Sequence, residues 1–442
     1  MVTPIEQRYI DMHPGSAERH VKAKDLFPDG VTHDGRRMAP FPIYATHGTG
    51  PHKWDVDGNR IIDYWTGHGS MILGHSHPEI VAAVANQIGK GTHLSASSDL
   101  EIKWGQQVVD LIPSAEKVRF HSSGTEATMM AIRMARAYSN KTKIVKFEEH
   151  FHGWSDYLSA GSAGVGGIPQ ESLDTMIVLP INDISIVEKT LEGNDDIAAI
   201  ILEPTGAHMG QIPIRPSFLN ELRELTDRTG VVLIFDEVVT GFRVSKGGAQ
   251  AYYGVTPDMT TMAKILGGGL PGGAVAGKAD IINMIEARDD ADFNQNRRIA
   301  HNGTFNANPL SAAAGTTALD LIANTPVNEM ADAMGSRLKD GLNDLLSRME
   351  IPGCASGIAS LIFLRLGVDH ECDKGVCIMT PEQMRSGNNA QRNSQFVISM
   401  LNNGVHATSR FIMSAAHREQ DIDETVEATE KSLTELRQMG LI

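Results

Sequence analysis

The chain has 442 residues, of which 41% are hydrophobic and 21% are charged, the usual balance of a globular protein. Its formal net charge of −15 argues against nucleic acid or an anionic membrane as a partner, because both bind basic surfaces. No run of the sequence reaches the roughly 18 apolar residues of a membrane span. We therefore expect small-molecule partners.

The three cysteines, Cys354, Cys372 and Cys377, show no Cys-x-x-Cys spacing, and they predict reduced thiols in a cytoplasmic protein. Cys372 and Cys377 lie close to His370, but a fourth metal ligand is missing from this set. We therefore expect a surface loop at this place and no metal site.

The first 76 residues combine one amphipathic helix pattern with two strand-like pieces. The helix is expected over Ser16–Phe27, and the strands are expected near Ile43–Thr46 and Ile61–Tyr64. We expect this N-terminal segment to contribute to a small domain.

From residue 77 to residue 315, helical patterns alternate with short apolar runs. These runs are Val118–Phe120, Lys143–Phe147, Ile197–Leu202 and Val231–Phe235. Continuous β-branched runs between helices predict a parallel sheet that is buried on both faces. We therefore expect an α/β fold in which helices cover a mostly parallel sheet, and residues 77–315 form its large domain.

After residue 316 the pattern changes to a long helix, a Gly-rich polar stretch and a closing helix. The closing helix carries one apolar stripe at helical spacing: Ile422, Val426, Thr429, Leu433 and Leu436. Residues 316–442 are therefore expected to form a smaller C-terminal α+β domain together with the N-terminal segment.

Lys264 lies on an apolar, Gly-rich turn, and Asp236 ends the fourth of the apolar runs. Pyridoxal phosphate needs two such groups: an amine that forms its Schiff base and an anion that keeps its ring nitrogen protonated. For this pair alone, a helix-capping Asp236 and a solvated Lys264 remain the alternative.

The segment HSSGTEA, residues 121–127, follows a predicted strand and opens a predicted helix. Ser123, Gly124 and Thr125 would offer hydroxyls and free amides to an anion at the positive end of that helix. A plain N-cap at Ser123 is the alternative. The segment fits neither a P-loop nor the Gly-x-Gly-x-x-Gly pattern, which argues against a nicotinamide oxidoreductase.

Three further segments place polar or aromatic side chains after strands or in a turn. Phe151 and His152 follow the second run, where an aromatic ring is able to stack on a flat cofactor and an imidazole is able to bind its edge. Glu203 ends the third run, where parallel sheets place ligands. Thr304 lies in a tight turn.

Taken together, these segments resemble the class III, fold-type I pyridoxal phosphate-dependent aminotransferases. The matching pieces are Ser122–Ala127, Phe151–Gly153, Glu203–Pro204, Phe235–Val238, Lys264 and Gly303–Thr304. The resemblance runs from about Phe27 to the C-terminus and is closest to the branch of glutamate-1-semialdehyde aminomutase and D-phenylglycine aminotransferase. A catalytically silent relative would lack the lysine or the hydroxyls, and this chain has both.

The resemblance implies a cofactor, pyridoxal 5′-phosphate, and a role for each matching residue. Lys264 would bind the cofactor covalently and move the substrate's proton, while Asp236 would pair with the ring nitrogen. Thr304 would reach the phosphate from the neighbouring subunit, so the resemblance implies a homodimer. The implied cofactor contacts are Ser123, Gly124, Thr125, Phe151, His152, Glu203, Asp236, Val238, Lys264 and Thr304.

The resemblance also places three residues at the substrate: Arg36, His68 and Arg410. Arg36 would pair with the substrate carboxylate, with Arg37 as the alternative anchor. His68 and Arg410 differ from the aminomutase pattern. They favour an aminotransferase that moves an amino group from an aromatic, D- or β-configured amino acid to a 2-oxo acid such as 2-oxoglutarate. The alternative is glutamate-1-semialdehyde 2,1-aminomutase, which transfers the amino group within one molecule.

Overall fold

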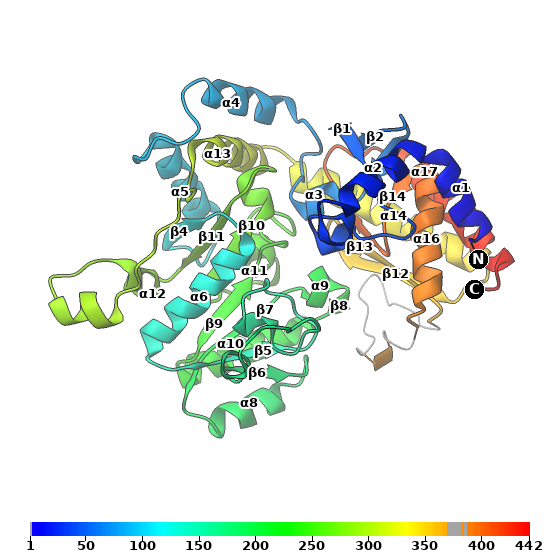
Figure 1. Cartoon of the computed structure of the whole chain (residues 1–442). Coiled ribbons are helices and arrows are strands. Elements are labelled where there is room, and N and C mark those ends of the chain that lie inside the picture. Colours follow the sequence, from blue (N-terminus) through cyan, green and yellow to red (C-terminus); the bar gives the residue numbers. More distant parts are fainter. Residues whose placement is uncertain (1, 369–381, 384–386) are drawn as a thin grey trace. The chain divides into compact units, whose positions relative to one another are not determined.

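The structure is a computed structural model that describes residues 2–368, 382–383 and 387–442. Unit 1 comprises residues 1–68, 72–77 and 329–442, and unit 2 comprises residues 69–71 and 78–328 (Figure 1). The predicted loop around His370, Cys372 and Cys377 lies outside the described residues. The domain boundaries after residues 76 and 315 remain predictions, and α13 (Pro309–Asn324) continues across the second of them.

Unit 2 is built on a seven-stranded sheet in the order β4-β11-β10-β9-β7-β5-β6. The strands are β4 (Lys117–His121), β5 (Lys143–Phe147), β6 (Met176–Leu179), β7 (Ile197–Leu202), β9 (Val232–Asp236), β10 (Met259–Ala263) and β11 (Gly273–Gly277). The pairs from β10 to β6 are parallel, whereas β11 is antiparallel to both β10 and β4. The predicted mostly parallel sheet is thus confirmed, and the four apolar runs form β4, β5, β7 and β9.

Helices cover both faces of this sheet. On one face, α6 (Gly124–Ser139) shares a buried cluster with Ile144 and Ile234. On the other face, α8 (Ile184–Glu192) and α10 (Pro216–Thr229) share a second cluster with Val145 and Leu233. Neighbouring residues of one strand enter different clusters because successive side chains of a strand point to opposite faces.

Shorter elements complete unit 2. They are α4 (Pro78–Ile88), α5 (Asp99–Leu111), η3 (Tyr157–Ser159), α7 (Gln170–Leu173), α9 (Ala207–Gly210), β8 (Ile212–Pro213), α11 (Gly248–Tyr253), η4 (Lys264–Gly267), α12 (Ala279–Ile282), η5 (Asn283–Ile285) and η6 (Phe293–Arg297).

Unit 1 contains a four-stranded sheet, β1-β2-β3-β14, and a three-stranded sheet, β12-β13-β15. Its strands are β1 (Ala45–Thr49), β2 (His52–Asp55), β3 (Arg60–Asp63), β12 (Gly353–Ile358), β13 (Leu361–Leu366), β14 (Val405–His406) and β15 (Arg410–Ile412). β14 pairs in parallel with β3, so the first sheet joins the two ends of the chain.

The helices of unit 1 also come from both ends of the chain. They are α1 (Pro4–Met12), α2 (Pro14–Lys24), η1 (Pro28–Gly30), η2 (Asp34–Arg36), α3 (Thr66–Gly69), α14 (Val327–Arg348), α16 (Ala390–Asn402) and α17 (Glu419–Gln438). The predicted closing helix is α17, and Ile422, Leu433 and Leu436 of its stripe are buried in the core of this unit.

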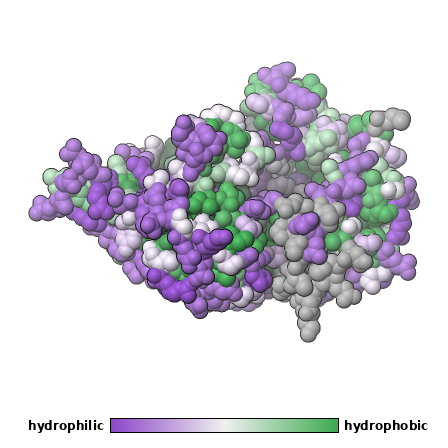
Figure 2. All heavy atoms as spheres, turned by 90° about the horizontal axis from the view of Figure 1, so that it is seen from below, coloured by the Kyte–Doolittle hydropathy of each residue, from purple (hydrophilic) through white to green (hydrophobic). Residues whose placement is uncertain are grey.

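The face of the molecule drawn in Figure 2 is largely hydrophilic, with smaller hydrophobic areas between the polar ones. Within the described residues, the helices are too short or too polar to cross a membrane.

Candidate active site

The candidate cofactor residues gather at one edge of the seven-stranded sheet. The strands β4, β5, β7, β9 and β10 run in the same direction, so their carboxyl ends meet at that edge. The segments that leave these strand ends carry Ser123, His152, Glu203, Asp236 and Lys264.

Asp236 is buried, and its side chain is held on both oxygens. The Nδ1 atom of His152 lies 2.7 Å from Oδ2. The hydroxyl of Thr261 and the amide of Val238 donate to Oδ1 over 3.2 and 3.1 Å. The carboxylate is therefore fixed in one orientation. No helix begins directly after Asp236 in the described chain, so the alternative that this residue caps a helix is wrong.

Lys264 lies directly after β10, at the first position of η4, with a left-handed backbone (φ 52°). Burial lowers the pKa of its amine, while Asp236 and Glu203 counter part of that effect. Trp104 holds the following turn, because its indole N–H donates to the carbonyl of Leu266 over 3.1 Å. A half-buried lysine with a lowered pKa is a better nucleophile than a solvated one.

Ser123 is the N-cap of α6, and its hydroxyl accepts the amide of Glu126 over 3.2 Å. The alternative that Ser123 is an N-cap is therefore confirmed. An anion site is still available, because the first amides of a helix have no partner within the helix. Gly273 of the neighbouring strand allows the close approach of this loop, since a Cβ there would lie 2.2 Å from the carbonyl oxygen of Ser123.

Two glycines show that the predicted segments are in contact. A Cβ at Gly124 would lie 2.9 Å from Val238 and 3.5 Å from the side chain of Ala263, which precedes Lys264. A Cβ at Gly153 would lie 2.6 Å from the hydroxyl of Thr125. The loop after β4, the segment after β5 and the ends of β9 and β10 therefore surround one place.

The carboxylate of Glu203 is bound by backbone amides of the protein. Its carboxylate accepts the amides of Phe151, His208 and Met209 over 3.0, 3.2 and 2.9 Å. Burial raises the pKa of this group, and the charge of His152 counters part of that effect. Glu203 thus holds the Phe151 loop in place, and a direct contact with the cofactor stays a prediction.

Phe151 and Thr304 expose their side chains. The exposed fraction of Phe151 is 61%, which is high for an aromatic residue beside buried groups. The side chain of Thr304 is exposed as well, and its carbonyl accepts a hydrogen bond from Nε2 of His93 over 2.5 Å. The structure does not bring Thr304 to the residues around Lys264 through any contact within the described chain.

The residues around Lys264 fit pyridoxal phosphate. A buried carboxylate, a half-buried amine of lowered pKa and an exposed aromatic ring lie together with a helix start that is closely packed by glycines. In addition, Nε2 of His152 is buried without a hydrogen-bond partner among the described residues. Buried polar atoms are normally satisfied, so an unsatisfied one at this place indicates a ligand.

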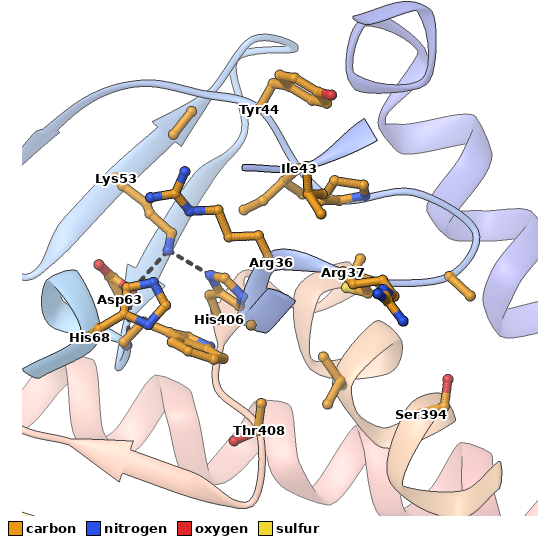
Figure 3. A pocket seen from close by; sticks show the side chains of 18 of the residues that line it. Arg36, Arg37, Ile43, Tyr44, Lys53, Asp63, His68, Ser394, His406 and Thr408 are labelled. Carbon is orange, nitrogen blue, oxygen red and sulfur yellow. Dashed lines mark hydrogen bonds and ion pairs between the residues drawn. The ribbon is translucent and has the colours of Figure 1, made fainter. Parts of the chain in front are cut away.

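Unit 1 contains a pocket of about 840 Å³, and Arg36 and His68 line it (Figure 3). Arg36 donates to the hydroxyl of Thr32 over 3.0 Å. The ring of His68 stacks on His33 at 4.6 Å and meets Trp65 edge-on at 4.9 Å. Two of the three predicted substrate residues therefore share one cavity.

Arg410, the third predicted substrate residue, lies on β15 and is absent from the residues that line the pocket, although Thr408 and Ser409 line it. Its backbone pairs with Phe363 of β13. A role of Arg410 at the substrate stays a prediction.

Sequence reasoning missed a polar network in the same pocket. Lys53 lies 2.9 Å from Oδ1 of Asp63 and 2.6 Å from Nδ1 of His406 (Figure 3). His75 lies 2.7 Å from the other oxygen of Asp63. No local pattern could have revealed this network, because β2, β3 and β14 bring it together from distant parts of the chain.

The sequence model of the family Aminotransferase class-III matches residues 34–362 of this chain. The chain is 38% identical to a glutamate-1-semialdehyde 2,1-aminomutase of Syntrophobacter fumaroxidans, over 94% of this chain and 96% of the relative. Among solved structures, an omega-transaminase of Sphaerobacter thermophilus is 32% identical, with a TM-score of 0.88 over 97% of this chain and 99% of the other. A β-phenylalanine aminotransferase of Variovorax paradoxus is 28% identical, with a TM-score of 0.85 over 98% of both chains.

The fold and the site are those of a fold-type I, pyridoxal phosphate-dependent enzyme. Within that class, the chain belongs to the class III aminotransferase family. The predictions of family, fold class, enzyme and cofactor are confirmed. The relatives favour the aminomutase, which the sequence analysis gave as the alternative, over the intermolecular aminotransferase.

Proposed function

We propose that this protein is a glutamate-1-semialdehyde 2,1-aminomutase that uses pyridoxal phosphate bound at Lys264. The observation that carries this proposal is the near full-length similarity to relatives of that name, at 38% and 37% identity. The gathering of Lys264, Asp236 and His152 at one sheet edge supports the cofactor-dependent part of the proposal.

When it is bound, the cofactor withdraws electrons from the substrate carbon that loses a proton. Lys264 would hold the cofactor covalently, and its amine would accept and return the proton of the substrate carbon. Asp236 keeps a proton on the ring nitrogen, and His152 holds Asp236 in position. Phe151 and Val238 would pack against the cofactor ring.

Ser123, Gly124 and Thr125 bind the phosphate through hydroxyls and helix-start amides. Thr304 contributes a hydroxyl to the phosphate of a second copy, so the enzyme works as a homodimer in the cytoplasm. Mixed dimers test this arrangement. Lys264→Ala and Thr304→Ala chains together rebuild one intact site only when Thr304 acts across the interface, so mixing recovers activity. If Thr304 acts within its own chain, mixing recovers none.

In unit 1, Arg36 binds the substrate carboxylate, because its planar guanidinium meets a carboxylate through two hydrogen bonds. His68 lines the same pocket and offers a second polar contact. Arg36→Met is therefore expected to raise KM far more than it lowers kcat.

The second candidate is an intermolecular aminotransferase. Two observations favour it: the pocket of about 840 Å³ is large for a short-chain substrate, and the transaminases of known structure are 32% and 28% identical. In this reaction an aromatic, D- or β-amino acid gives its amino group to 2-oxoglutarate.

One experiment separates the two candidates. The holoenzyme is incubated with glutamate-1-semialdehyde and no acceptor, and 5-aminolevulinate is measured, with Lys264→Ala as the control. A parallel screen supplies amino acids and 2-oxoglutarate and measures glutamate. 5-Aminolevulinate in the first assay supports the aminomutase. Glutamate in the second assay alone supports the aminotransferase and refutes the first proposal.

A further inference from the structure

Few charged groups line the pocket of unit 1, and their net charge indicates which ligand charge fits the pocket. Apart from histidines, its charged lining residues are Arg36, Arg37, Lys53 and Asp63. Three of these groups are cations and one is an anion. The ligand charge that fits the pocket depends on which cations already have a partner.

Lys53 is neutralised inside the protein. Its ammonium lies 2.9 Å from Oδ1 of Asp63, and the exposed fraction of the Asp63 side chain is 2%. Burial alone would raise the pKa of Asp63, but the charge of Lys53 and the hydrogen bond from His75 outweigh burial and hold this pKa below its usual range. Asp63 is therefore ionised, and Lys53 and Asp63 together contribute no net charge.

His406 adds no charge either. Burial and the neighbouring Lys53 lower its pKa to about 3, so the ring is neutral. Because an ammonium only donates hydrogen bonds, Nδ1 of His406 accepts from Lys53 at 2.6 Å, and the ring proton lies on Nε2. His406 thus directs the Lys53 ammonium toward Asp63 without competing for its charge.

Arg37 has its own counter-ion outside the lining residues, because its guanidinium lies 2.6 Å from Oδ2 of Asp29. In Figure 3 the Arg37 side chain also lies apart from the group formed by Lys53, Asp63 and His406. Arg36 differs: its side chain extends toward that group, its hydrogen-bond partner is the hydroxyl of Thr32, and no described carboxylate lies within 4 Å of it. Histidines apart, the described lining of the pocket therefore holds one positive charge without a counter-ion, that of Arg36.

We propose that this pocket binds one carboxylate through Arg36, and that Asp63 makes it selective for monocarboxylates over dicarboxylates by neutralising Lys53. The second carboxylate of a dicarboxylate ligand would lose its hydration in the pocket without pairing with a free cation. This loss makes the free energy of binding less favourable. The lining also includes the apolar side chains of Met38, Ile43 and Phe396, which suit an uncharged substrate body. This inference rests on the proposed function, because it takes the pocket as the place of the substrate carboxylate.

The test uses two unreactive probes of equal chain length, pentanoate and glutarate, in calorimetric titrations of the holoenzyme. Neither probe has an amine or a carbonyl that reacts with the cofactor. The wild type is expected to bind pentanoate at least about tenfold more tightly than glutarate. Asp63→Asn frees the charge of Lys53, so glutarate affinity is expected to rise about tenfold or more, and the preference for pentanoate is lost. Asp34→Asn is the matched control, because Asp34 is exposed, lies two residues before Arg36 in sequence and does not line the pocket.

A second pair of variants keeps the test independent of the folding of Asp63→Asn. Lys53→Met leaves Asp63 without its neutralising cation in the pocket that also holds Arg36, so pentanoate affinity is expected to fall about tenfold. Lys53→Met with Asp63→Asn restores the single free charge, and the wild-type preference returns. The inference is overturned if Asp63→Asn keeps the wild-type ratio of affinities, or if Lys53→Met binds pentanoate normally.

The variant Arg36→Met tests the proposed function separately. Loss of pentanoate binding in Arg36→Met supports the pocket as the carboxylate site, even when the ratio in Asp63→Asn overturns the inference. If Arg36→Met binds pentanoate as tightly as the wild type does, Arg36 does not bind the substrate carboxylate.

Discussion

His152 and Asp236 form a buried pair in which Nδ1 lies 2.7 Å from Oδ2, at the carboxyl ends of two strands of one sheet. The other oxygen of Asp236 is held by Thr261 and by the amide of Val238. Because both oxygens are fixed, the carboxylate cannot rotate away from a positively charged ligand group.

Asp236→Asn is expected to lower kcat/KM by about 10²–10⁴-fold, because a neutral amide cannot stabilise a proton on the ring nitrogen. Steady-state kinetics with a reactive amino substrate measures this loss, and cofactor absorbance shows whether the vitamer still binds. Asp227→Asn, at an exposed residue of α10, serves as the control. A wild-type kcat/KM in Asp236→Asn would contradict the role given to this residue.

Lys264 is expected to react with added cofactor at a lower pH than an exposed lysine, because burial lowers its pKa. An amine is protonated below its pKa, so the rate of incorporation into apoenzyme falls as the pH drops through that value. Borohydride reduction followed by peptide mass spectrometry identifies the modified lysine. Recovery of the label on another lysine, or a rate that still rises steeply near pH 10.5, would speak against this assignment.

Gly273→Ala is expected to weaken cofactor retention, because the new Cβ would lie 2.2 Å from the carbonyl of Ser123 and displace the loop before α6. We expect at least a tenfold rise in the Kd of the cofactor, since a displaced loop loses several phosphate hydrogen bonds of about 1 kcal/mol or more each. Dialysis followed by absorbance measures retention. Gly89→Ala is the control, because its Cβ would have an ordinary contact of 3.7 Å. Equal retention in both variants would refute the prediction.

Buried histidines are expected to make the fold sensitive to acid. Burial lowers the pKa of His121 and His406 to about 3 and that of His417 to about 4. The unfolded chain binds protons at these residues below about pH 6.5, while the folded chain does not, so the free energy of unfolding falls as the pH drops from about 6.5 toward 4. Each such histidine contributes a slope of roughly 1.4 kcal/mol per pH unit within that window.

Calorimetric melting between pH 7 and 4 measures this effect. His121→Asn is expected to show a shallower fall in Tm than the wild type, and substitution of the exposed His47 is expected to leave the slope unchanged. Parallel curves for the wild type and His121→Asn would show that His121 does not contribute.

The short runs in the sequence predicted four of the seven strands of the sheet in unit 2, namely β4, β5, β7 and β9. β5 and β7 have the predicted bounds. The run of β7 is uninterrupted and apolar, as expected for a strand that is buried on both faces of a sheet, whereas the run of β5 contains two lysines. β6, β10 and β11 were not predicted. In β11, the glycines and alanines that surround Val275 have little strand propensity, and the close approach of Ser123 to Gly273 fixes the place of this strand.

Most of the predicted cofactor residues follow strands whose carboxyl ends meet at one edge of the sheet, and this pattern together with the family resemblance pointed to them; Thr304 lies in a turn instead. The polar network in the pocket of unit 1 could not be predicted in this way. Lys53, Asp63 and His406 carry no local signal, and their meeting depends on the pairing of β3 with β14. Charge balance in that pocket is a property of the tertiary structure alone.

The pairing of β3 with β14 has a consequence for synthesis of the protein. Ile62 is made early on the ribosome, yet its partner Val405 emerges only near the end of translation. The first sheet of unit 1 therefore cannot be completed until β14 has been synthesised. Until then, the apolar residues of its early strands stay exposed.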